Sequence, residues 1–272
     1  MSTALAEESA EFLPATEGGP EEERPRGQRR RATLRALVRY GTTPLIIIVV
    51  SGVLTWWATS LQLDAFELRT MTVPYMMTHI EEHVELTVLS TVGVIVVAVT
   101  LGMVVTRRRT GFLSPIAIGA GNIGQATPPI GLIVLLALVL GVGFWVAVLA
   151  LFIYAALPVL RNTVTGIENV DPGVIEAAQG MGMGNLAILF RVQLPLALPV
   201  IAAGVRTALV LDVGTATIAT FISAGGLGDM IVSGISLERT PVIVTGAVTT
   251  ALLALAFDWV GGLLESALKP IT

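Results

Sequence analysis

Two histidines and two glutamates stand together in the sequence HIEEH, at residues 79–83, with a spacing that suits metal binding. The pattern H-x-x-E-H occurs in one group of zinc peptidases, where both imidazoles bind zinc and a glutamate activates water. His79 and His83 are four residues apart, so a helix would place them on one face. The chain contains no other histidine and no cysteine, so the sequence supplies no third ligand with confidence. We therefore favour an amphipathic helical segment without metal and expect no catalytic residue.

Glycines at residues 119–124, which read GAGNIG, fit the G-x-G-x-x-G pattern of dinucleotide-binding sites. Such a site requires a preceding strand and an acidic residue about 20 positions later, where this chain has Phe144 in an apolar run. Close packing of helices through small residues is the better explanation. The phosphate-binding pattern G-x-x-x-x-G-K-S/T does not occur, and the sole lysine is Lys269. We therefore expect neither a cofactor nor ATP hydrolysis in this chain.

The composition places these residues in a membrane protein. The chain has 272 residues, of which 54% are hydrophobic and 13% charged, well below the charged fraction of soluble domains. Several runs long enough to cross about 30 Å of hydrocarbon carry no charge. These runs are expected to be helical, because lipid offers no partner to an unpaired backbone amide. We therefore predict an all-α helical bundle that crosses the cell membrane several times.

The apolar runs predict six membrane spans. Their approximate ranges are 43–61, 86–106, 113–140, 144–160, 196–223 and 242–264. Pro128 and Pro129 interrupt the third span, and the glycine-rich stretch SAGGLGDMIVSGI after the fifth span predicts a short or re-entrant segment. Broken backbone at membrane depth is tolerated where protein or a water-filled cavity surrounds it. These breaks are therefore typical of a transport pathway, although a simple kink or loop is also compatible with them.

The distribution of basic residues sets the orientation, because arginine and lysine accumulate in cytoplasmic segments. With the N-terminus inside, the outer segments carry only Arg69 and Arg239. The inner segments carry Arg24, Arg26, Arg29, Arg30, Arg31, Arg35, Arg39, Arg107, Arg108, Arg109, Arg161, Arg191 and Lys269. Both termini are therefore expected inside the cell.

Two segments precede the main body of the chain. Residues 1–40, acidic and then basic, predict a disordered cytoplasmic tail. This tail is not expected to be a cleavable signal, because a long polar stretch precedes the first apolar run. Residues 41–82 predict an additional N-terminal span followed by an external segment.

Asp212 lies deep within the fifth span. An acid at such depth costs about 2.5–3.5 kcal/mol on insertion scales and usually faces other helices or water. Its neighbours on the same helical face are mostly small, and one of them, Thr215, carries a hydroxyl. Two interpretations stay open. In the first, Asp212 is buried between helices and is either protonated or hydrogen-bonded to Thr215 or to a partner subunit. In the second, Asp212 and Thr215 line a translocation path, and Asp212 offers a passing cation a negative charge.

The cytoplasmic loop at 161–195 is polar, unlike the rest of the chain. Asp171 before a proline predicts the start of a short helix at 172–180. The glycines of GMGMG end this helix, and Asn185 is expected to cap a second one. Two short helices with a glycine elbow form a docking surface for a partner, although an ordinary solvated loop is the alternative.

This loop resembles the EAA loop of ABC-importer permeases, whose pattern is EAA, three residues, G, nine residues, I, one residue, LP. Every spacing is kept here, with valine in place of isoleucine, at Glu176, Ala177, Ala178, Gly182, Val192, Leu194 and Pro195. The resemblance extends over residues 83–270. Segments such as HVELTVLS, QLPLALPVIAAGVRTALV and GTATIATFISAGGLGD are similar to permeases of the glycine betaine/carnitine/choline (osmoprotectant) importers.

The resemblance implies a fold of the type I ABC-importer permease kind and a transport subunit rather than an enzyme. It also implies that the short helix of the loop seats in a groove of a cytoplasmic ATPase dimer, which binds ATP-Mg. The other implied partners are a second permease copy or paralogue, an external substrate-binding protein and membrane lipid, with no nucleic acid. The implied cargo is a small osmoprotectant such as glycine betaine, carnitine or choline.

Three alternatives are carried forward. The same architecture serves other small solutes, so the cargo is open. A membrane enzyme would use His79 and His83, and a secondary transporter driven by an ion gradient would use Asp212 as a proton carrier. A quaternary ammonium is usually held among aromatic faces, but the four tryptophans lie near predicted span ends. We therefore expect weak contacts along a path, with high-affinity recognition by the external binding protein.

Overall fold

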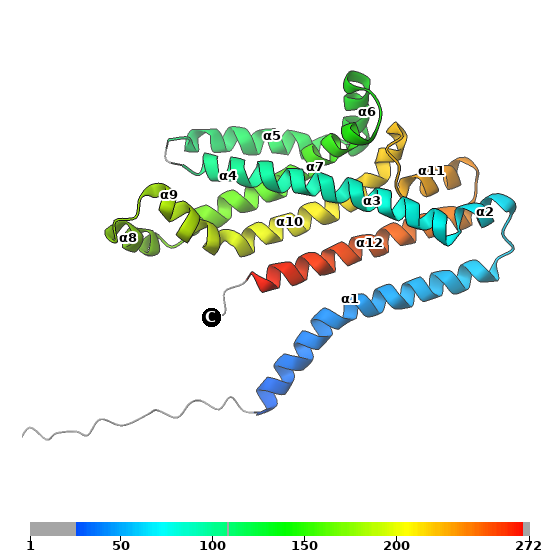
Figure 1. The fold of residues 1–272 in the computed structure, drawn as a ribbon, viewed down its shortest axis with the longest axis horizontal. Coiled ribbons are helices and arrows are strands. Elements are labelled where there is room, and N and C mark those ends of the chain that lie inside the picture. Colours follow the sequence, from blue (N-terminus) through cyan, green and yellow to red (C-terminus); the bar gives the residue numbers. More distant parts are fainter. Residues whose placement is uncertain (1–25, 108, 269–272) are drawn as a thin grey trace, which may run out of the picture. The chain divides into compact units, whose positions relative to one another are not determined.

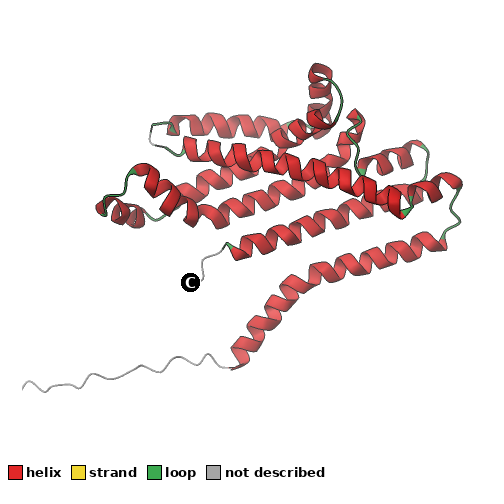
Figure 2. Cartoon of the chain, in the orientation of Figure 1, coloured by secondary structure: helices red, strands yellow, loops and turns green. Residues whose placement is uncertain are grey.

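The computed structural model describes residues 26–107 and 109–268, which form helices and the loops that join them (Figure 1). Figure 2 shows the same ribbon coloured by secondary structure, with no strand among the described residues. The chain divides into two units, residues 1–41 and 42–272, and the second unit contains the helical bundle. The all-α fold predicted from the composition is confirmed.

The elements follow one another along the chain as labelled in Figure 1. In order they are α1 (Arg26–Ser60), α2 (Ala65–Thr70), α3 (Val73–Val94), η1 (Ile95–Val99), α4 (Thr100–Val105), η2 (Gly111–Leu113), α5 (Ser114–Ala126), α6 (Pro129–Leu140), α7 (Phe144–Glu168), α8 (Pro172–Gly180), α9 (Asn185–Ile188), η3 (Leu189–Gln193), α10 (Leu194–Ala216), η4 (Thr217–Ile222), α11 (Gly228–Ser236) and α12 (Thr240–Ala267). Elements η1 and η3 are π-helical turns, whereas η2 and η4 are 3-10 helical turns.

Five helical stretches among the described residues are long and apolar enough to cross a membrane. They are Gly41–Ser60, Val73–Val105, Phe144–Glu168, Asn185–Ile222 and Thr240–Ala267. The stretch Gly111–Ala126 meets α6 at 99°, and this bent pair passes the same test of length and composition only when its two helices are taken together, as a broken span or a re-entrant loop. The bend falls beside Pro128 and Pro129, where the sequence predicts a break. The short segment predicted after the fifth span is α11.

The second span begins earlier than the sequence predicts. Helix α3 starts at Val73 rather than near residue 86, with Pro74 in its first turn, where a backbone donor is not needed. Three glutamates in these turns lower the local hydropathy and hide them from an apolar pattern. The HIEEH sequence therefore lies within the long helix rather than in a separate segment before it.

The first helix also extends further than expected. Helix α1 begins at Arg26, inside the stretch 1–40 that the sequence predicts as a disordered tail. Its arginines, alanines and leucines are favourable helix residues, which explains why a charged segment still adopts a helix. Residues 1–25 lie outside the described residues.

Helices α7 and α10 form the centre of the bundle and approach each other through small residues. Helix α7 also contacts α3, α5 and α6, while α10 contacts α3 and α12. A Cβ added to Gly204 of α10 would lie 2.8 Å from the Asn162 Cβ and 2.9 Å from the Pro158 carbonyl oxygen. On α7, a Cβ at Gly166 would lie 3.1 Å from the Cβ of Ala197. Contacts through small residues are typical of helices that associate in lipid.

Two of the three glycines of the GAGNIG sequence serve the same purpose. They lie in α5, where a Cβ at Gly121 would come within 2.9 Å of Leu157 and a Cβ at Gly124 within 3.0 Å of Ile153. Both contacted side chains belong to α7. The interpretation of this pattern as a helix-packing feature holds for Gly121 and Gly124, which face α7, whereas a Cβ at Gly119 would meet nothing within 4 Å.

We expect Gly204→Ala to destabilise the bundle by about 1–3 kcal/mol, because the added methyl group overlaps Asn162 and the backbone at Pro158. Gly214→Ala on the same helix is the matched control, since a Cβ there meets nothing within 4 Å. Thermal unfolding of the purified variants in detergent measures the difference. An equal effect of the two substitutions would contradict the packing described for α7 and α10.

Candidate functional site

The cytoplasmic loop folds around helix α8 as the sequence predicts. The Asp171 carboxylate accepts a hydrogen bond of 2.7 Å from the Gly173 amide, and Pro172 is the first helical residue. The side chain thus satisfies an amide that the helix leaves unpaired, and the proline needs no partner. Helix α8 ends at Gly180, which matches the predicted range.

A glycine elbow links α8 to α9. Gly182 has a φ of +78°, a conformation that favours glycine, and its Cβ position is open to solvent. Asn185 is the first residue of α9 rather than its cap, which corrects the prediction. Gly184 takes the cap position because its extended backbone, with φ −72° and ψ 159°, fits the residue before a helix. The Arg107 guanidinium donates to the Asn185 carbonyl oxygen at 3.3 Å and so ties the elbow to the end of α4.

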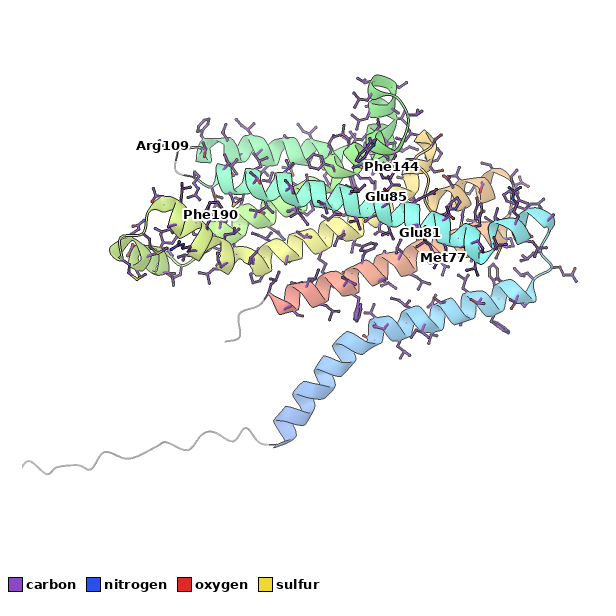
Figure 3. All side chains as sticks on the ribbon, viewed as in Figure 1. Met77, Glu81, Glu85, Arg109, Phe144 and Phe190 are labelled. Atoms are coloured by element: carbon purple, nitrogen blue, oxygen red, sulfur yellow. The ribbon has the colours of Figure 1, made fainter. Side chains whose placement is uncertain are left out.

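Burial lowers the pKa of the Arg107 guanidinium from its ordinary value, but the group stays charged at neutral pH. This positive charge lies at the same end of the bundle as α8 and α9. Figure 3 labels Arg109 and Phe190 at this end and Phe144 nearer the opposite end.

The surface of the loop combines exposed polar and apolar side chains. Of the residues in the EAA-type pattern, Glu176, Ala177, Gly182 and Pro195 are exposed, Val192 and Leu194 are half-buried, and Ala178 is buried. Three large apolar side chains next to them are exposed, namely Met181 (75%), Leu186 (69%) and Phe190 (54%). Leu186 and Phe190 belong to the first turns of the apolar stretch Asn185–Ile222, and Met181 lies in the loop before it.

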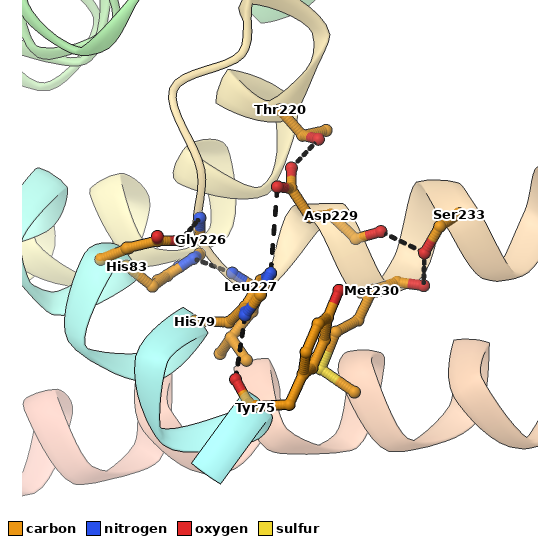
Figure 4. Close-up of polar contacts among 10 residues, drawn as sticks. Tyr75, His79, His83, Thr220, Gly226, Leu227, Asp229, Met230 and Ser233 are labelled. Carbon is orange, nitrogen blue, oxygen red and sulfur yellow. Dashed lines mark hydrogen bonds and ion pairs between the residues drawn. The ribbon is translucent and has the colours of Figure 1, made fainter. Parts of the chain in front are cut away.

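At the other end of the bundle, His83 joins three elements. Its imidazole is fully buried, and Nε2 donates to the Val213 carbonyl oxygen of α10 at 2.9 Å. The Leu227 amide donates to Nδ1 at 3.3 Å, in the loop before α11 (Figure 4). A neutral imidazole with its proton on Nε2 satisfies both partners, because a carbonyl accepts and an amide donates.

The neighbouring Glu82 binds the same loop. Its carboxylate accepts from the Gly226 amide at 2.8 Å. Gly225 and Gly226 have φ values of +82° and +93°, and a Cβ at Gly225 would come within 2.7 Å of the Glu82 carboxylate. Only glycine fits this turn, both for its backbone conformation and for its close approach to α3.

His79 has different partners from His83. Its ring stacks on Tyr75 with centroids 4.2 Å apart, and Nδ1 donates to the Tyr75 carbonyl oxygen at 2.9 Å. Nε2 lies 4.0 Å from one carboxylate oxygen of Asp229, and the other oxygen of this carboxylate accepts a hydrogen bond from the Thr220 hydroxyl (Figure 4). The two imidazoles thus have separate partners. His79 contacts Tyr75 and Asp229, whereas both ring nitrogens of His83 are hydrogen-bonded to backbone groups.

Asp212 lies in the contact between α10 and α3. Its side chain is fully buried, and the Thr91 hydroxyl donates to its carboxylate at 3.0 Å. The hydroxyl that donates to Asp212 therefore comes from α3 and not from Thr215, which is also buried. This placement fits the interpretation of a carboxyl buried between helices, while a role of Asp212 and Thr215 in a pathway stays a prediction.

One polar cluster was missed at the sequence level. The Arg206 guanidinium of α10 makes two hydrogen bonds of 2.7 Å to the Asp258 carboxylate and one of 3.4 Å to Glu265, both on α12. These residues line a groove of about 430 Å³ between the two helices. The sequence DWVGGLLE could have indicated a polar contact of α12, because its acidic residues and glycines stand at i, i+3, i+4 and i+7 and therefore share one helical face.

Residues 95–270 match the family described as the binding-protein-dependent transport system inner membrane component. The chain is 40% identical to the glycine betaine/carnitine/choline transport system permease protein OpuCD of Bacillus subtilis (strain 168), over 72% of this chain and 86% of that protein. It is 41% identical to the choline transport system permease protein OpuBB of the same organism, over 70% of this chain and 86% of that protein. The inward-facing MetNI methionine ABC transporter has a similar fold, with a TM-score of 0.64 and 24% identity over 74% of this chain and all of that chain.

We expect His83→Ala to lower the melting temperature clearly more than His79→Ala. Loss of the buried imidazole leaves the Val213 carbonyl and the Leu227 amide without partners, at about 1–3 kcal/mol each. His79 is the matched control, because its hydrogen-bonded partner is a carbonyl within its own helix. Thermal unfolding in detergent reads out both variants, and similar losses would show that His83 does not hold the loop.

Proposed function

This chain belongs to the family of binding-protein-dependent transport system inner membrane components, and we propose that it admits small osmoprotectants in an ATP-driven importer. Family membership makes it a membrane-spanning permease subunit rather than an enzyme. The observation that supports coupling to an ATPase is the cytoplasmic loop, which folds into two short helices with an EAA-type surface and a glycine elbow.

The proposed cargo is glycine betaine, carnitine, choline or a similar solute. The names of several relatives, at 38–41% identity, give these compounds as their cargo. All three carry a trimethylammonium group, and they differ in the presence of a carboxylate. The same architecture importing another small solute is the second candidate, which the resemblance of fold to a methionine transporter supports.

The proposed partners follow from the two ends of the bundle. A cytoplasmic ATPase dimer, which carries ATP-Mg, would receive helix α8 with Glu176 exposed on its surface. A second permease copy or paralogue would complete the path, and an external substrate-binding protein would deliver cargo at the opposite end. The enzyme and proton-carrier alternatives have less support, because each histidine is held by its own contacts and Asp212 is buried against Thr91.

We expect the chain to purify with an ATPase subunit from its native membrane and to hydrolyse no ATP by itself. In proteoliposomes, a binding protein loaded with glycine betaine should stimulate hydrolysis by the complete complex. The control is the ATPase subunit alone, which should not respond to the loaded binding protein. Robust hydrolysis by the isolated polypeptide would overturn the assignment of ATPase activity to a partner.

We expect Gly182→Leu and Glu176→Lys each to reduce ATP-driven uptake at least about tenfold with the spans still inserted. Leucine strains a backbone at φ +78° and blocks close approach, while lysine reverses a charge on the exposed face of α8. Gly182→Asn should retain more uptake, because asparagine tolerates this conformation better.

Glu168→Lys, the same charge reversal on an exposed residue at the end of α7, is the control for Glu176→Lys. The measurement is uptake of labelled cargo, normalised to the amount of assembled complex. Normal uptake by both loop variants, with the ATPase bound, would show that the loop does not couple hydrolysis to transport.

A further inference from the structure

Helix α3 buries a stripe of four polar side chains in the bundle. They stand at i, i+4, i+7 and i+8, are each at most 3% exposed, and are His83, Thr87, Ser90 and Thr91. Polar groups are costly to bury unless each of them finds a hydrogen-bond partner. His83 and Thr87 donate to backbone carbonyl oxygens, and Thr91 donates to the Asp212 side chain of α10. Ser90 is the member of the stripe whose oxygen has no such bond.

Two buried oxygens without a hydrogen bond lie at the Asp212 side chain. Its Oδ2 accepts the Thr91 hydroxyl at 3.0 Å, while its Oδ1 has no donor. The Ser90 hydroxyl lies next to the same carboxyl but forms no hydrogen bond of regular geometry. Both residues are fully buried, so bulk solvent reaches neither oxygen. One hydrogen bond between Oδ1 and the Ser90 oxygen would satisfy both groups.

No positive charge offsets an ionised Asp212 in this contact. The described residues of α3, α7 and α10 include two arginines and no lysine. Arg206 is bound to carboxylates of α12, and Arg161 is bound to a side-chain amide of α5. His83 is neutral, because one ring nitrogen donates to a carbonyl and the other accepts from an amide. A carboxyl group buried without a cation takes up a proton rather than remain charged.

We propose that Asp212 is a neutral carboxylic acid in the folded protein, with its proton on Oδ1 and the Ser90 oxygen as the acceptor. Oδ2 then accepts from Thr91, and each polar side chain of the α3 stripe has a partner. Two hydrogen bonds fasten α10 to α3, and the contact contains no charge. Asp212 is in this assignment a positioning residue that holds the two helices together.

Infrared absorption distinguishes a protonated carboxyl from an ionised carboxylate and provides the first test. The chain has five aspartates, and the four besides Asp212 are partly or fully exposed, namely Asp64, Asp171, Asp229 and Asp258. In the purified full chain at neutral pH, carbon-13 in the aspartate carboxyls should shift the carbonyl band of one protonated aspartic acid. Asp212→Asn should remove this band. The matched control is Asp258→Asn, which removes an ion-paired carboxylate and should leave the band unchanged.

Two infrared results would overturn the proposal. One is a spectrum in which all labelled aspartates are ionised, and the other is a protonated band that survives Asp212→Asn. The isotope measurement on the unmodified chain requires no substitution. It therefore decides the protonation of the buried aspartate even if the Asn variant does not fold.

Thermal unfolding in detergent tests whether the acid fastens the helices. Asp212→Asn should melt within about 3 °C of the unmodified chain, because its amide donates to Ser90 and its carbonyl accepts from Thr91. Asp212→Leu offers neither group and should melt about 5 °C lower or more. Ser90→Ala should cost less in the Asp212→Leu chain than alone, since the shared bond is already lost. Equal costs of Ser90→Ala in both chains, or a Leu variant as stable as the Asn variant, would contradict the assignment.

Discussion

The hydrogen bonds from α3 to backbone groups of α10 and of the following loop hold the outer half of the bundle together. Backbone amides and carbonyls that are buried away from water must find partners within the protein. Glu82 and His83, adjacent in sequence, bind the Gly226 and Leu227 amides, and the other nitrogen of His83 binds the Val213 carbonyl. Two side chains of α3 thus provide hydrogen-bond partners for backbone groups outside regular helix. They hold a turn in which Gly225 and Gly226 both have positive φ.

The inner half depends on a different kind of contact. Along α7 and α10, glycine and alanine bring the backbones close together. Between α10 and α12, the side-chain hydrogen bonds seen among the described residues are those of Arg206. Apolar side chains gain little from contacting each other in place of lipid, so close packing and ion pairing carry specificity there. The bundle therefore combines a hydrogen-bonded outer end with a tightly packed, charge-bearing inner end.

Local chemistry was enough to predict several features from the sequence. Asp171 before Pro172 located the start of α8, and two consecutive prolines located the break between α5 and α6, because caps and prolines act within a few residues. The hydrogen-bond partners of His83 could not be predicted from local patterns, because they lie 130 and 144 positions away in the chain. The DWVGGLLE sequence marks one face of α12, but Arg206 lies on α10, and only the approach of the two helices makes Arg206 and Asp258 a pair.

The continuity of the helical stretch from Asn185 to Ile222 gives the molecule a mechanical property. This stretch has 38 residues, roughly 55 Å at about 1.5 Å per residue, and it begins directly after the glycine elbow of the cytoplasmic loop. Its far end meets the glycine turn held by Glu82 and His83. When α10 pivots on α7, which packs against its middle, the two ends of the stretch move in opposite directions, with η3 and Pro199 as the points where it can bend. A tilt imposed at the cytoplasmic surface would therefore reach the external turn without any relay of side-chain contacts, and its amplitude would be set by where α7 supports the stretch.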